Sequence, residues 1–171
     1  MKNLILVLLL AISALFSSCD KLFEDDKLSL TREPYTGNEL RMDGYYYETT
    51  GTRVLVFYRN GTVNDFGGIN LNEMDQFEES MFTNQLRNLK SSWGVFQIKN
   101  DDILYERWIH SPPPSINTYF FRGKILNDTT YVINEMYRIK NGKKYDVSVR
   151  NDTYKFKKLD QKPDSTNQYI N

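Results

Sequence analysis

Short stretches of alternating apolar and polar residues, separated by turn residues, run through most of the chain after residue 43. Alternation with a period of two is typical of strands that bury one face. The expected strands are 44–48, 53–59, 62–66, 93–98, 103–109, 118–126, 129–139, 143–149 and 154–159. Asn-Gly pairs at 60–61 and 141–142 and Asn-Asp pairs at 127–128 and 151–152 stand between strands. The pattern predicts about nine short antiparallel strands joined by tight turns.

The first Asn-Gly pair gives the most specific local prediction. Asn60 and Gly61 separate the expected strands 53–59 and 62–66. A two-residue hairpin of type I′ requires positive φ angles at both turn positions, which Asn followed by Gly adopts readily. We therefore expect a type I′ turn at residues 60–61.

The hydrophobic period changes between residues 70 and 90. Apolar residues recur there mostly at spacings of three and four, at Leu71, Met74, Phe77, Met81, Phe82, Leu86 and Leu89. This spacing places them on one face of an α-helix. We expect helix 70–90 to pack across the wall or the mouth of the β-structure, and binding to a partner is the alternative use of its apolar face.

The consecutive hairpins favour an up-and-down sheet. At about eight to nine strands, closure into a barrel removes the exposed edges. The predicted fold is therefore mainly β, an antiparallel up-and-down β-barrel spanning residues 41–160 with one inserted helix. A β-sandwich is the alternative that the pattern leaves open.

The start of the chain has a different character. Lys2 is followed by an apolar run to Phe16 and by two serines before Cys19, the single cysteine. These features are typical of an export signal, and Leu15-Phe16-Ser17-Ser18-Cys19 resembles a bacterial lipobox. The resemblance implies cleavage before Cys19 and acylation of its thiol. We predict a lipoprotein signal peptide at 1–18, the lipidated cysteine and a flexible tether at 19–40, and a disordered tail at 161–171.

Composition and motifs argue against several classes of function. Lysine and arginine balance aspartate and glutamate at 22 each, so the net charge does not favour nucleic acid as a partner. One histidine, His110, and a cysteine expected to be acylated do not supply the usual zinc site or a Ser-His-Asp triad. No phosphate-binding loop or calcium loop motif is present. We expect no enzyme activity, no metal and no cofactor.

The basic residues are nevertheless concentrated near the end of the chain. The last expected hairpin carries Arg138, Lys140, Lys143, Lys144, Arg150, Lys155, Lys157 and Lys158. Lysines often protect the exposed edge of a sheet, which is the simplest interpretation of this cluster. The alternative is a surface that binds anionic glycans or lipid headgroups.

Several segments together resemble the lipocalin-like lipoproteins of Bacteroidetes. They are Gly44-Tyr45-Tyr46, Asn60-Gly61, Trp93-Gly94-Val95-Phe96, Ile103-Leu104-Tyr105-Glu106-Arg107-Trp108 and Ile125-Leu126-Asn127-Asp128-Thr129-Thr130. The likeness covers most of residues 40–160 and implies a lipocalin-like barrel with no assigned activity. Tyr46 stands where true lipocalins carry the tryptophan of Gly-x-Trp. The acidic residues after Cys19 also resemble the surface-export signal of these lipoproteins.

The strand 103–109 can face the core in two registers, because strand side chains alternate. In one register Leu104, Glu106 and Trp108 point inward, and the Glu106 carboxylate orients the polar end of a ligand. In the other register Ile103, Tyr105 and Ile109 face the core, and Glu106 lies in water beside Arg107. The higher apolar count of the second face favours it.

Two functions follow for a lipid-anchored protein of the outer membrane, with the membrane as its partner through acylated Cys19. The first is binding of a small apolar or amphipathic ligand in the barrel, with Trp93, Tyr105, Glu106 and Trp108 as the candidate lining. The second is a filled barrel that contacts an envelope protein or glycan, which the many large aromatics favour slightly. Both functions are compatible with exposure of the protein at the cell surface and with O-glycosylation at Asp128-Thr129 or Asp164-Ser165.

Overall fold

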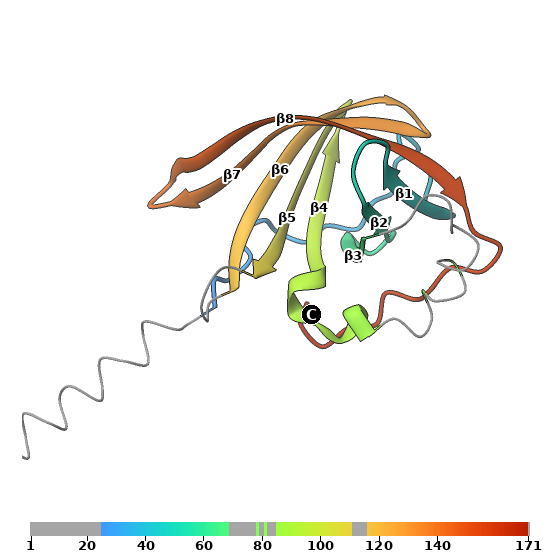
Figure 1. The fold of residues 1–171 in the computed structure, drawn as a ribbon, viewed down its shortest axis with the longest axis horizontal. Coiled ribbons are helices and arrows are strands. Elements are labelled where there is room, and N and C mark those ends of the chain that lie inside the picture. The colour runs from blue at the N-terminus through green and yellow to red at the C-terminus, as the bar shows by residue number, and fades with distance from the viewer. Residues whose placement is uncertain (1–24, 69–77, 79–80, 82–84, 111–115, 171) are drawn as a thin grey trace, which may run out of the picture.

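The computed structural model is a closed barrel of eight antiparallel strands, each paired with its neighbours in sequence (Figure 1). It describes residues 25–68, 78, 81, 85–110 and 116–170. The strands are β1 (Gly44–Glu48), β2 (Arg53–Phe57), β3 (Thr62–Gly68), β4 (Trp93–Lys99), β5 (Asp102–His110), β6 (Ile116–Asn127), β7 (Thr130–Lys140) and β8 (Lys143–Lys158). β8 returns to pair with β1, for example through Tyr46 and Phe156, and this pairing closes the barrel. The predicted up-and-down β-barrel is confirmed.

The strand count differs from the nine expected segments because β8 is continuous. The turn predicted at Asn151-Asp152 is wrong, since both residues lie inside β8. The β7–β8 register shifts between Ile133 and Glu135, where β8 carries an extra residue. Asparagine and aspartate therefore mark a β-bulge here, which accepts the same turn-favouring residues without reversing the chain.

The two Asn-Gly pairs adopt different turns. Asn141 and Gly142 have φ angles of 52° and 73°, as a type I′ turn requires. At the first pair only Gly61 has a positive φ, of 85°. The Gly61 N–H donates to the Tyr58 carbonyl at 2.9 Å, and the Asn60 side chain accepts from the Thr62 N–H. The type I′ prediction at residues 60–61 is therefore wrong, because the reversal is centred one residue earlier and Gly61 forms a bulge after it.

Most of the predicted helix 70–90 lies outside the described residues. Its last part forms two short 3₁₀ helices, η3 (Gln85–Asn88) and η4 (Lys90–Ser92), which lead into β4. Trp93 follows at once and donates from Nε1 to the Arg87 carbonyl at 2.7 Å. This bond fixes the short helices on the outer wall of the barrel.

The described part of the predicted tether, residues 25–40, lies against the barrel and is not a free linker. Tyr35 and Leu40 are 8% and 1% exposed, and the Tyr35 N–H donates to the Arg59 carbonyl at 2.8 Å. Acidic residues, Pro34 and Gly37 favour a flexible segment. The apolar residues spaced between them nevertheless bury enough surface to hold it against the barrel.

The predicted disordered tail is also in contact with the barrel up to residue 170. The Lys162 ammonium donates to the carbonyls of Met42 and Phe57. Further along, Tyr169 and Ile170 pack against the apolar cluster on the outer wall. The segments before and after the barrel therefore belong to one folded unit with it.

Buried side chains form two clusters separated by the wall of the sheet. The inner cluster fills the barrel and includes Tyr46, Phe57, Phe96, Tyr105 and Tyr131. The outer cluster covers the wall formed by the first five strands and includes Tyr45, Val56, Phe66, Trp93 and Trp108. Strands buried on both faces account for the apolar residues on both sides of β2.

Candidate functional site

Aromatic rings fill one half of the barrel interior. The ring of Phe57 lies 5.0 Å from that of Phe96, 5.7 Å from Tyr46 and 5.9 Å from Tyr131, measured between centroids. Tyr105 stacks on Phe121 with centroids 4.6 Å apart. Such spacings are those of packed aromatic pairs. This half of the interior is a solid core.

Residues 35–42 cover this half of the barrel, which we call the plugged end. Tyr35, Leu40 and Met42 belong to the inner cluster. The Tyr46 hydroxyl donates to the Asp128 carbonyl at 2.8 Å, and the Arg41 N–H donates to the same carbonyl at 3.0 Å. The segment that precedes β1 is thus joined to the β6–β7 turn across the mouth.

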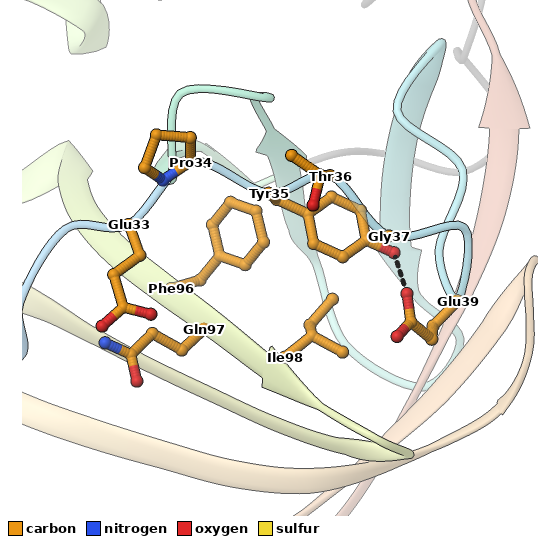
Figure 2. A pocket seen from close by; sticks show the side chains of 9 residues that line it. All are labelled: Glu33, Pro34, Tyr35, Thr36, Gly37, Glu39, Phe96, Gln97 and Ile98. Carbon is orange, nitrogen blue, oxygen red and sulfur yellow. Dashed lines mark hydrogen bonds between the residues drawn. The ribbon is translucent and has the colours of Figure 1, made fainter.

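Surface pockets lie at the rim of the plugged end. One of them, of about 490 Å³, is lined by Leu40, Met42 and Arg59 among others. A smaller one, of about 210 Å³, lies between residues 33–39 and strand β4. Figure 2 shows the rings of Tyr35 and Phe96 facing each other beside Ile98, with the Tyr35 hydroxyl bonded to Glu39 at 2.8 Å. A pocket of this size, open to the surface, is small for a typical small-molecule site.

Charged side chains occupy the opposite half of the interior, which we call the charged end. Asp65 on β3 lies 2.6 Å from Arg107 on β5 and 3.3 Å from Arg53 on β2. The Gly67 N–H also donates to the Asp65 carboxylate, at 2.8 Å. The Asp65 and Arg107 side chains are 8% and 7% exposed, whereas that of Arg53 is 38% exposed. The inner two charges form a buried pair and Arg53 reaches toward solvent.

Burial dominates the electrostatics of this interior. Burial raises the pKa of Asp65, and the nearby Arg53 guanidinium opposes that rise. Burial also raises the pKa of Tyr105 and Tyr131 well above the ordinary value, so both phenols stay protonated. The arrangement is suited to holding the sheet together through an internal ion pair. Its sequence signal was the alternation of Asp65 with Val63 on β3, which places a carboxylate on the core face.

Glu106 lies on the outer wall and is fully buried there, at 0% exposure. Its Oε2 accepts from the N–H of Ser29 at 2.7 Å and from the N–H of Leu30 at 2.6 Å. Burial raises its pKa, and these backbone N–H groups act in the opposite direction. The expectation that Glu106 lies in water beside Arg107 is wrong, because Arg107 points into the barrel and residues 25–31 cover Glu106. We call residues 25–31 the N-terminal strap.

Further contacts hold the N-terminal strap across β5 and β6. The Asp26 N–H donates to the Ile116 carbonyl at 2.9 Å, and the Trp108 Nε1 donates to the Asp26 carbonyl at 2.7 Å. Asp25 lies 3.0 Å from Lys90, and this ion pair lowers the pKa of Asp25. The N-terminal strap therefore enters the folded unit at the charged end of the barrel.

The four residues proposed to line a ligand pocket do not share one cavity. Tyr105 lies inside the barrel, together with Ile103, as the favoured register predicts. Trp93 and Trp108 belong to the outer cluster, and Glu106 lies on the same wall as Trp108 under the N-terminal strap. The two tryptophans and the glutamate thus attach flanking segments to the barrel.

A hairpin extends beyond the barrel at the charged end. β6 and β7 last pair at Phe120 and Tyr137, and β8 pairs with β1 only from Tyr154 onward. Residues 138–150 lie between these limits. We call them the basic arm, and they extend away from the barrel (Figure 1). Its lysines at 140, 143 and 144 are exposed. Arg138 at its base lies 2.9 Å from Asp26 and joins the basic arm to the N-terminal strap.

The remaining features are Cys19, His110, a metal site and a membrane-spanning helix. Cys19 lies outside the described residues. His110 is exposed at the end of β5. Among the described side chains, no three His, Cys, Asp or Glu residues gather as a metal site would require. Within those same parts of the chain, no helix has the length and apolar character to cross a bilayer.

Comparisons with known proteins leave the family of this chain open. No family model, no curated protein and no solved structure matches it. The function must therefore be inferred from the residues and the geometry described above.

Proposed function

We propose that this chain is a lipid-anchored protein of the cell envelope, without catalytic activity, that acts through contacts of its outer surface. The filled interior carries this proposal. Aromatic side chains occupy the volume in which a barrel of this size would hold a ligand. A filled barrel supports the interaction role over storage of an apolar molecule.

The lipid anchor is supported by the sequence alone. The apolar run and the lipobox-like residues before Cys19 are features of an exported and acylated protein. The acidic residues that follow Cys19 resemble the export signal of surface lipoproteins, which favours the outer membrane and its outer face. A single acyl chain binds membranes only weakly, so stable anchoring needs several chains or a second contact with the lipid.

Uptake of an apolar fluorescent probe tests the filled interior. The full chain is titrated with the probe beside the Phe121→Ala variant, which removes a ring from the inner cluster. We expect no saturable uptake by the natural chain and measurable uptake by the variant, because truncation of a core ring leaves an apolar cavity. Saturable uptake by the natural chain, competed by a second apolar molecule, contradicts the proposal.

Intact mass tests the anchor separately. The chain is purified from the envelope fraction of a bacterium that processes lipoproteins, beside the Cys19→Ser variant. We expect the mass of residues 19–171 plus lipid for the natural chain, and neither cleavage before residue 19 nor lipid for the variant. An unmodified Cys19 in the natural chain contradicts the anchoring.

A further inference from the structure

A polar pocket lies where the basic arm leaves the barrel. Its volume is about 270 Å³, and three segments that are distant in sequence line it. Among the lining residues are Asp26 and Ser29 of the N-terminal strap, Thr118 on β6, and Arg138, Lys140 and Tyr145 of the basic arm. The pocket therefore exists only while the N-terminal strap is docked on the barrel.

Arg138 is fixed in this pocket by four neighbours. Its Nη2 donates to the Asp26 carboxylate at 2.9 Å and to the Asn117 side chain at 2.7 Å. Its guanidinium carbon lies 5.4 Å from the ring centroid of Tyr119 and 5.1 Å from that of Tyr145. A guanidinium that is stacked on aromatic rings and bonded to a carboxylate keeps one position. This pre-organisation lowers the entropy cost of binding a ligand here.

Asp26 keeps an acceptor for a ligand. The Thr118 N–H donates to Asp26 Oδ2 at 3.1 Å, and Arg138 donates to the same oxygen. Oδ1 accepts no hydrogen bond from any described residue, and the Asp26 side chain is 41% exposed. Oδ1 is therefore available to accept from a hydroxyl group.

Lys140 and Lys143 continue the positive charge of Arg138 along one face of the basic arm. Lys140 lies opposite Lys143, and Arg138 lies opposite Tyr145. Arg138 and Lys140 are two residues apart on β7, so these four side chains project from the same face of the hairpin. Both lysines are exposed, and neither forms an ion pair with any described residue. This face therefore presents two unpaired positive charges beside the pocket.

The chemistry of the site fits an acidic sugar. The hydroxyl groups of a sugar match the Asp26 carboxylate and the Ser29 hydroxyl, and the half-buried Tyr145 ring offers an apolar surface beside them. A carboxylate on the sugar matches the two lysines. An acyl chain fits less well, because charged and hydroxyl side chains dominate the lining.

We propose that this pocket and the two lysines bind an acidic glycan, a sugar polymer that carries carboxylate groups. One sugar lies in the pocket against Tyr145 with hydroxyl groups on Asp26, and carboxylates of this sugar and its neighbours accept from Lys140 and Lys143. The inference rests on the proposed function, since it names the partner of the outer surface. A single polar pocket binds one sugar weakly, so the glycan is lost during purification and binding is measured by titration.

Calorimetric titration of the full chain in a nonionic detergent tests this site. The probe is an oligogalacturonate, which carries a carboxylate on every sugar, and its methyl ester is the matched neutral control. We expect saturable binding of the acid that weakens as salt is added, and no binding of the ester, because the ion pairs with the lysines are lost. A polyglutamate of similar charge should bind much more weakly, since it offers the pocket neither hydroxyl groups nor a sugar ring.

Variants of the chain show which side chains bind the probe. Lys140→Gln with Lys143→Gln should weaken binding about tenfold, the effect of losing one charge-assisted hydrogen bond. The control pair Lys155→Gln with Lys158→Gln removes the same charge at the far end of β8, where both lysines are exposed, and should change the affinity by less than about twofold. Tyr145→Leu should weaken binding about fivefold, because the aromatic surface is lost.

The outcomes separate this site from the proposed function. An equal loss in the two lysine pairs, or equal binding of the ester or of polyglutamate, overturns the acidic-glycan site. Absence of binding overturns it as well, and leaves the filled barrel intact if the natural chain still takes up no apolar probe. Saturable uptake of the apolar probe with unchanged glycan binding overturns the filled barrel alone.

Discussion

The two ends of the barrel interior are filled by different kinds of side chain. At the plugged end, rings such as Phe57 and Phe96 meet at 5.0 Å beneath the segment that carries Tyr35. At the charged end, the Asp65–Arg107 pair at 2.6 Å fills the interior with polar atoms, and the basic arm projects beyond it. One end is closed by apolar packing and the other by an ion pair.

This difference indicates which surfaces remain for function. Aromatic side chains fill the barrel interior at the plugged end, where the pockets that remain lie at the rim and open to the surface, and the ion pair would have to be disrupted to make room inside the charged end. The basic arm carries exposed lysines at its turn and exposed valines farther along β8. The outer surface next to the charged end is therefore the part of the described molecule best suited to contact a partner.

Truncation at the plugged end should have the largest effect on stability. Phe57→Ala removes a ring that contacts Tyr46, Phe96 and Tyr131. We expect a loss of about 4 kcal/mol in the free energy of unfolding, from urea denaturation, because a cavity replaces the ring. Leu126→Ala, at an exposed leucine, should change it by less than about 0.5 kcal/mol. Equal small losses for both variants would contradict tight packing at this end.

Breaking the ion pair at the charged end should cost somewhat less. Asp65→Leu leaves the buried Arg107 without its closest partner, and we expect a loss of about 3 kcal/mol. Adding Arg107→Met should recover most of this loss, since two apolar side chains can replace a buried pair. Urea denaturation of the single and the double variant measures how much the ion pair contributes to the stability of the charged end. A double variant as unstable as Asp65→Leu would mean that the pair is not the main stabilising contact there.

Release of the N-terminal strap should be a local effect. Glu106→Ala removes the acceptor of the Ser29 and Leu30 N–H groups. We expect the amides of residues 25–31 to exchange hydrogen faster, because buried donors lose their partner. The free energy of opening for this segment should fall by about 2 kcal/mol. Exchange in β1 and β2 should stay unchanged. As a control, Gln97→Ala removes only an exposed bond to the Thr31 carbonyl and should have little effect.

The smallest expected effect is a pH dependence near the plugged end. Burial lowers the pKa of Lys162 to about 8 from its ordinary 10.5. Between these values the unfolded chain holds a proton that the folded chain has released, so raising the pH favours folding. The stability of the natural chain relative to Lys162→Met should therefore rise between about pH 8 and pH 10.5. A relative stability that falls over this window would contradict a lowered pKa for Lys162.

The sequence predicts the barrel better than its attachments. Alternation identifies β1 to β7 and the inward face of Tyr105, because strand burial follows a period of two. It misassigns Glu106 and Trp108 because their partners, Ser29 and Asp26, lie some 80 residues away in the sequence, at separations of 77 and 82. Local patterns carry no signal for such contacts. The bulge at Asn151 resembles a turn in the sequence because bulges and turns use the same residue types.

The central claim is that the barrel is filled and acts from its outer surface. Native mass spectrometry on the full chain, purified in mild detergent from its own envelope fraction, tests this claim most directly. We expect the mass of the polypeptide with the lipid of Cys19 and no further adduct that survives gentle desolvation. A reproducible additional mass that disappears on denaturation would contradict it and would indicate a ligand held in the barrel.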